Sequence, residues 1–111
     1  MSVDASQLDA LHALIAARKE TGADQSYTMT LLAGGPALCA RKFGEEAVET
    51  IVAALAGDRA NLVSESADFL YHWLVLLTAL DVSPEEVYAE LARREGRSGL
   101  DEKAARKKPE S

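Results

Sequence analysis

Apolar residues recur at helical spacing along most of the chain, while polar and glycine-rich stretches interrupt them. Turn and capping residues divide the sequence into five predicted helices, which span approximately residues 4–19, 27–32, 36–56, 59–80 and 84–95. Pro36 suits the first turn of the third helix, and Ser83 followed by Pro84 and Glu86 is typical of a helix start. The pattern indicates a helical body over about residues 6–95.

The third and fourth predicted helices are the longest, and only Gly57 and Asp58 separate them. So short a connection favours an antiparallel pair. In the fourth helix, residues 70–80 are apolar around most of the circumference, and a helix of this kind must be buried on all sides. A chain of four or five short helices is too small to enclose it, so we expect a homodimer with this segment near the interface.

Composition supports an all-α, single-domain protein covering residues 1–111. Aromatic residues make up only 5% of the sequence, and β-sheets usually recruit aromatic and β-branched residues. The one cysteine, Cys39, excludes an internal disulfide and a thiolate-rich metal site, and we expect it in the core with Trp73. The apolar stretch 69–80 is too short for a membrane span, and no leader pattern opens the chain. We therefore expect a cytoplasmic protein without a membrane partner.

The charge is unevenly distributed. The net charge of −6 disfavours nucleic-acid binding. Residues 1–92 carry 5 basic and 14 acidic side chains, whereas residues 93–108 carry 7 basic and 3 acidic ones. The basic tail, about residues 96–108, has two interpretations: a solvated chain end, or an anion-binding strip for a phosphorylated substrate.

Four acidic residues form the strongest chemical pattern. Glu46 and Glu49 lie three residues apart on the third helix, as do Glu65 and Asp68 on the fourth, so each pair shares one helix face. Solvated faces commonly carry acids, but these lie on the helices expected to form the core, and only Lys42 accompanies them. Carboxylates about 4 Å apart repel by roughly 4 kcal/mol at an effective dielectric constant of about 20. The pattern therefore predicts a divalent cation site, for Mg²⁺ or alternatively Mn²⁺.

Four segments of the sequence closely resemble the phosphoribosyl-ATP pyrophosphatase family, within the MazG-like all-α NTP pyrophosphatase superfamily. They are SYTMTLL at 26–32, KFGEEAVE at 42–49, ESADFLYH at 65–72 and REGRSGLDEK at 94–103. The paired acidic motifs indicate only the superfamily, while the first and last segments indicate the member family. The resemblance covers about residues 8–107. Phe43 and a proline-free loop at 22–25 depart from the family pattern, and neither includes a predicted ligand.

The resemblance implies Mg²⁺-dependent hydrolysis of phosphoribosyl-ATP to phosphoribosyl-AMP and pyrophosphate, the second step of histidine biosynthesis. We assign Glu46, Glu49, Glu65 and Asp68 as metal ligands, which makes Glu46 and Glu49 catalytic residues. Lys42 would lie beside the phosphates, and either Glu45 or a water on the metal would act as base. His72 is expected to support the site or the dimer core rather than bind metal. Candidate substrate contacts, each with a structural or solvated alternative, are Tyr27, Thr28, Ser98, Lys103 and Arg106.

Two other functions fit the same acidic pattern. One is hydrolysis of free non-standard nucleoside triphosphates, and the other is a helical metal-binding or interaction module without catalysis. The tail separates the two enzymes, because a hydrolase of free nucleotides has no evident need for the element from Ser98 to Arg106.

Overall fold

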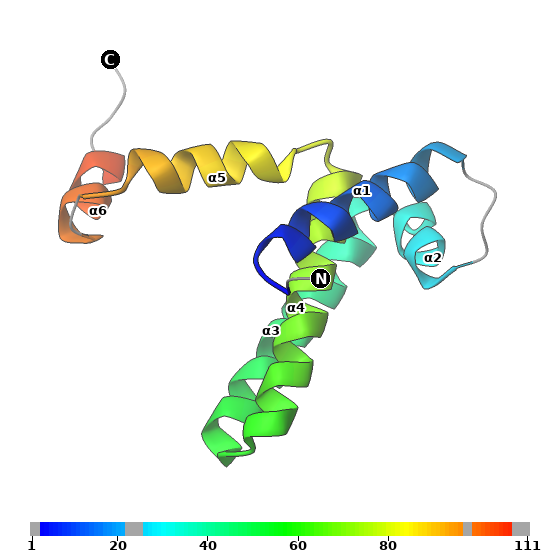
Figure 1. Cartoon of the computed structure of the whole chain (residues 1–111), viewed down its shortest axis with the longest axis horizontal. Helices are drawn as coiled ribbons and strands as arrows, with labels where there is room; N and C mark the ends of the chain where they lie inside the picture. Colours follow the sequence, from blue (N-terminus) through cyan, green and yellow to red (C-terminus); the bar gives the residue numbers. More distant parts are fainter. Residues whose placement is uncertain (1–2, 22–25, 97–98, 108–111) are drawn as a thin grey trace.

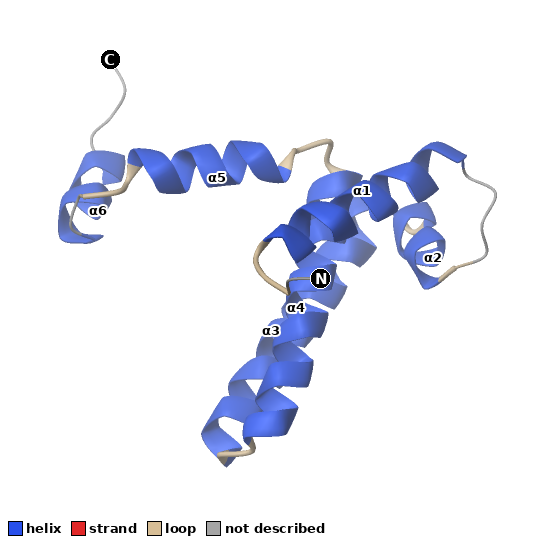
Figure 2. Ribbon diagram, in the orientation of Figure 1, coloured by secondary structure: helices blue, strands red, loops and turns tan. Residues whose placement is uncertain are grey.

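The computed structural model describes residues 3–21, 26–96 and 99–107, and these form six helices without a strand (Figure 2). The helices are α1 (Ser6–Thr21), α2 (Tyr27–Ala33), α3 (Gly35–Ala56), α4 (Arg59–Ala79), α5 (Pro84–Arg93) and α6 (Gly99–Lys107). The predicted all-α class is confirmed. Helix α6 was not predicted, because the charged composition of the tail hides its short helical segment.

The residues predicted to end or start helices do so in the structure. Gly57 adopts φ = 75°, a left-handed conformation that costs glycine little, and it ends α3. The Asp58 side chain then accepts the backbone N–H of Asn61 at 3.0 Å and starts α4. Ser83 and Glu86 cap each other's backbone at the start of α5. The tight turn makes α3 and α4 a long antiparallel hairpin, as predicted (Figure 1).

The core lies at one end of this hairpin, where α1 and α2 pack against it (Figure 1). Its fully buried side chains come from four helices and are Ile15, Leu31, Cys39, Leu74 and Val75. Trp73 packs against them. The predicted core placement of Cys39 and Trp73 is therefore confirmed, Trp73 being partly buried. The Cys39 thiol also donates to the carbonyl oxygen of Leu31 at 3.3 Å, which ties α3 to α2.

The apolar segment 70–80 is covered more fully within one chain than we expected, while a homodimer with this segment near the interface stays a prediction. The chain itself encloses much of the apolar segment 70–80, since α1 and α2 bury Leu74 and Val75. Further uncovered apolar surface lies toward the turn of the hairpin. It is a stripe formed by Val48, Ile51, Val52 and Leu55 of α3 with Val63 and Leu70 of α4. We call this set the apolar stripe.

Helices α5 and α6 form an arm that leaves the end of α4 and extends away from the hairpin (Figure 1). The turn before α5 passes through Asp81, whose φ of 57° lies in the left-handed region that aspartate tolerates better than most residues. Among the described residues, no helix has the length and apolar character that crossing a membrane requires.

Candidate active site

The four predicted metal ligands lie on the two helices of the hairpin, Glu46 and Glu49 on α3 and Glu65 and Asp68 on α4. Thr50 joins the two helices at this level: its hydroxyl lies 2.8 Å from the carbonyl oxygen of Glu46 and 3.2 Å from that of Glu65. Sequence reasoning missed Thr50. The available signal was its position four residues after Glu46, where a polar side chain shares the face of the acids.

The structure brings three of the four predicted ligands together. One carboxylate oxygen each from Glu46, Glu49 and Glu65 lies within 4.8 Å of the others. Glu46 and Glu65 are half-buried, while Glu49 is exposed. Asp68 lies near enough that its negative charge raises the pKa of both Glu46 and Glu65. We call these four residues the carboxylate cluster.

The electrostatics of the cluster are unfavourable in the absence of a cation. The pKa of Glu46 is raised to about 7, first by desolvation and then by hydrogen bonding to and repulsion from Glu49. The pKa of Glu65 is raised for the same reasons. The Oε2 atoms of Glu46 and Glu65 are buried, and no described group donates a hydrogen bond to either. Buried carboxylate oxygens without donors form a ligand set suited to a hard divalent cation.

Lys42 lies one turn before Glu46 on α3, and Glu45 directly precedes it. The Lys42 ammonium lies 3.4 Å from a carboxylate oxygen of Glu45, and the Arg41 guanidinium lies 3.7 Å from the other. Glu45 is exposed and Lys42 is half-buried. Two basic side chains therefore pair with Glu45, the neighbour of Glu46 in the sequence.

Helix α2 connects to the cluster through His72. The Tyr27 hydroxyl lies 3.1 Å from Nε2 of His72, and Nδ1 of His72 lies 2.7 Å from the carbonyl oxygen of Asp68. Because a carbonyl oxygen only accepts, Nδ1 must carry the proton. Both ring nitrogens are thus engaged and the ring is buried, which suits the predicted supporting role of His72.

Comparison of this sequence with known proteins identifies its family. The sequence model of the phosphoribosyl-ATP pyrophosphohydrolase family matches residues 8–95. The chain belongs to this family. A protein of Parvibaculum lavamentivorans named phosphoribosyl-ATP pyrophosphatase is 64% identical over 106 residues, covering 96% of this chain and 97% of its own. Proteins of the same name from Ruegeria pomeroyi and Paramagnetospirillum magneticum are 60% and 55% identical, covering 88% and 97% of this chain and 93% and 99% of their own.

The other substrate contacts expected from the phosphoribosyl-ATP pyrophosphohydrolase pattern lie in different environments. Tyr27 is half-exposed, whereas Thr28 is buried and its hydroxyl lies 2.5 Å from that of Tyr71. In this structure Thr28 therefore joins α2 to α4. Lys103 and Arg106 are exposed on α6, at the far end of the arm (Figure 1). Ser98 lies outside the described residues.

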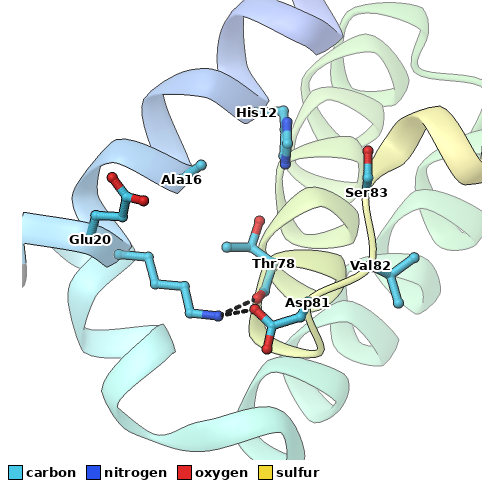
Figure 3. A pocket seen from close by; sticks show the side chains of 8 residues that line it. His12, Ala16, Glu20, Thr78, Asp81, Val82 and Ser83 are labelled. Carbon is cyan, nitrogen blue, oxygen red and sulfur yellow. Dashed lines mark hydrogen bonds and ion pairs between the residues drawn. The ribbon is translucent and has the colours of Figure 1, made fainter.

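A separate hollow of about 420 Å³ lies between α1 and the turn from α4 to α5 (Figure 3). Lys19 crosses it, and its ammonium lies 2.9 Å from the carbonyl oxygen of Thr78 and 2.7 Å from the Asp81 carboxylate. None of the four cluster residues lines this hollow. Its lining does not offer the converging carboxylates that phosphate chemistry with a cation requires.

Proposed function

We propose that this protein hydrolyses phosphoribosyl-ATP to phosphoribosyl-AMP and pyrophosphate, the second step of histidine biosynthesis, in the cytoplasm and with Mg²⁺ as cofactor. The observation that carries the proposal is the convergence of the Glu46, Glu49 and Glu65 carboxylates, two of which hold buried oxygens without a donor. Membership of the phosphoribosyl-ATP pyrophosphohydrolase family supports the choice of substrate.

The residues present fit the proposed cation. Glu46, Glu49, Glu65 and Asp68 would hold it, since their oxygens are the hard ligands that Mg²⁺ prefers and their mutual repulsion is relieved by positive charge. When bound, such a cation polarises a phosphoryl oxygen and neutralises developing negative charge. Mn²⁺ is the alternative occupant because it shares this ligand preference.

Side chains around the carboxylate cluster would attract the substrate, activate the water and support the site. Lys42 would attract the phosphates of the substrate to the edge of the cluster, because its ammonium is only half-buried and its nearest partner, Glu45, is exposed. Glu45 is a candidate base for the attacking water. Hydrogen bonds to Tyr27 and to the Asp68 carbonyl fix the His72 ring, which holds α2 against the acidic face of α4.

We also propose that the protein is a homodimer. The apolar stripe exposes four large side chains on α3, with Ile51 57% and Leu55 84% accessible. Contiguous apolar patches of this kind are rarely left to solvent. A two-fold arrangement would place the same stripe of two copies together, which buries both with one contact.

The test of function is pyrophosphate release from phosphoribosyl-ATP, compared with ATP and dUTP, in buffer containing Mg²⁺. The proposal expects phosphoribosyl-ATP to be turned over with a kcat/KM at least a hundredfold above that of either free nucleotide. Preference for a free nucleotide would instead indicate a hydrolase of non-standard triphosphates. No release from any of the three would leave a non-catalytic metal-binding module.

A further inference from the structure

Side-chain hydrogen bonds reach the backbone carbonyl groups of three residues in the carboxylate cluster. The Thr50 hydroxyl lies 2.8 Å from the carbonyl oxygen of Glu46 and 3.2 Å from that of Glu65. The Nδ1–H of His72 donates to the carbonyl oxygen of Asp68 at 2.7 Å. These bonds add to those of the helices themselves, and they hold the backbone from which the carboxylate side chains project.

Of these two donors, Thr50 is the one that joins the two helices carrying the cluster. His72 and its acceptor Asp68 both lie on α4, whereas Thr50 of α3 reaches Glu65 of α4, 15 positions away in the sequence. The two helices lie side by side over this stretch (Figure 1). A hydroxyl has a single proton, so Thr50 shares it between the two carbonyl oxygens. One side chain therefore links the backbone of a cluster residue from each helix.

The short threonine side chain is well suited to fix the separation of α3 and α4. Its hydroxyl is attached to Cβ, so one torsion angle determines its position, and branching at Cβ makes that torsion stiff in a helix. The glutamate carboxylates lie at the ends of longer side chains with more torsions. They also repel one another, which favours separation of the two helices. The Thr50 bridge opposes that repulsion at the level of the cluster.

We propose that Thr50 is a positioning residue for the reaction: by holding the backbone of Glu46 and Glu65 together, it sets the separation at which the carboxylate cluster shares one divalent cation. Thr50 itself touches neither the cation nor the substrate. Groups that orient metal ligands commonly change metal affinity by about 10–100-fold when they are removed. The inference rests on the proposed function, in which the cluster holds Mg²⁺.

Binding of Mg²⁺ alone, without substrate, tests the role of the hydroxyl. The full chain is freed of metal with a chelator and titrated with Mg²⁺ in a calorimeter. Thr50→Val keeps the branched shape and removes the hydroxyl, so the dissociation constant should rise about tenfold. Thr50→Ala, which suits a helix better, removes the hydroxyl a second way and should have the same effect. Thr50→Ser retains the hydroxyl and should stay within about threefold of the parent.

Thr78 provides a matched control on α4. Its hydroxyl donates to the carbonyl oxygen of Leu74 at 2.8 Å, the same bond within a helix that Thr50 makes to Glu46, but among the described residues it has no acceptor on a second helix. Thr78→Val should therefore bind Mg²⁺ like the parent, and circular dichroism checks that each variant folds. Parent-like affinity in Thr50→Val, or an equal loss in Thr78→Val, would overturn the inference alone. A parent that binds no Mg²⁺ would overturn the proposed cofactor as well.

A second measurement needs neither metal nor substrate, and it therefore separates this inference from the proposed function. The ¹³C chemical shift of a backbone carbonyl moves to higher frequency when the oxygen accepts a hydrogen bond. In the metal-free protein, the Glu65 carbonyl signal should move to lower frequency in Thr50→Val and keep its position in Thr50→Ser. The Asp68 carbonyl, held by His72, is the internal control. A Glu65 signal that is unchanged in Thr50→Val would show that the hydroxyl does not bridge the helices, whichever substrate the enzyme hydrolyses.

Discussion

The two ends of the α3–α4 hairpin are formed by the same two helices, but other helices cover one end and leave the other exposed. At the closed end, α1 and α2 cover the hairpin and bury Cys39, Leu74 and Val75. At the open end, residues 46–70, the apolar stripe is exposed although its side chains are as hydrophobic as those of the core. The difference therefore comes from coverage and not from composition.

The carboxylate cluster belongs to the open end, just beyond the limit of the core. This position explains its mixture of half-buried Glu46 and Glu65 with exposed Glu49. Full enclosure would make four ionised carboxylates too costly to desolvate, whereas full exposure would let water screen their attraction for a cation. A site at the boundary avoids both extremes, and a second copy covering the open end would complete its enclosure.

Removing a core side chain at the closed end should have the largest effect on folding. Leu74 is fully buried, so Leu74→Ala should lower the free energy of unfolding by about 2–5 kcal/mol through lost burial and a residual cavity. Urea denaturation measures this directly. Leu55→Ala at the open end is the matched control; its effect should be smaller and should fade on dilution, because it acts through association.

A charge in the apolar stripe should disrupt assembly and leave the fold intact. Ile51→Glu should raise the dimer dissociation constant at least tenfold, about 1.4 kcal/mol, since a carboxylate would be buried in the interface. Sedimentation equilibrium measures the constant. Leu14→Glu places the same charge at a similarly exposed leucine outside the stripe, and its dissociation constant should match the parent's. Equal constants for all three proteins would show that the open end is not the interface.

The carboxylate cluster should make metal-free stability depend on pH. The pKa of Glu46 is about 7 in the folded chain and its ordinary value is 4.5, so between these limits the folded state binds more protons than the unfolded state. Stability should therefore fall as pH rises from about 5 to about 7.5. Thermal melting in a chelating buffer should show a decline of a few degrees for the parent and a smaller one for Glu46→Gln. An equal decline in both proteins would place the effect elsewhere.

The sequence predicted the elements well because their signals are local. Gly57 with Asp58, and Ser83 with Glu86, fix helix ends through hydrogen bonds within a few residues. It did not predict which apolar residues α1 and α2 would cover, nor that the apolar stripe would be left exposed. Periodicity identifies an apolar face, but the element that packs on it depends on tertiary contacts.

The candidate site, too, was predicted where the signal is local and missed where it depends on tertiary contacts. Spacing placed Glu46 with Glu49, and Glu65 with Asp68, on helix faces that the hairpin then brought together. The bridging hydroxyl of Thr50 and the contact between Tyr27 and His72 were not predicted. These contacts join residues 15 and 45 positions apart, and no spacing rule along one helix reaches that far.

The most direct test of the central claim is the rate of pyrophosphate release from phosphoribosyl-ATP, measured as Mg²⁺ is added to the parent, Glu49→Gln and Glu20→Gln. Glu49→Gln keeps the shape of the side chain and removes one charge from the cluster, while Glu20 is an exposed acid on α1 and provides the control. The account predicts that Glu49→Gln loses at least a hundredfold in kcat at any Mg²⁺ concentration, and that Glu20→Gln behaves like the parent. Turnover by Glu49→Gln at the parent rate would contradict the assignment of the carboxylate cluster as the active site.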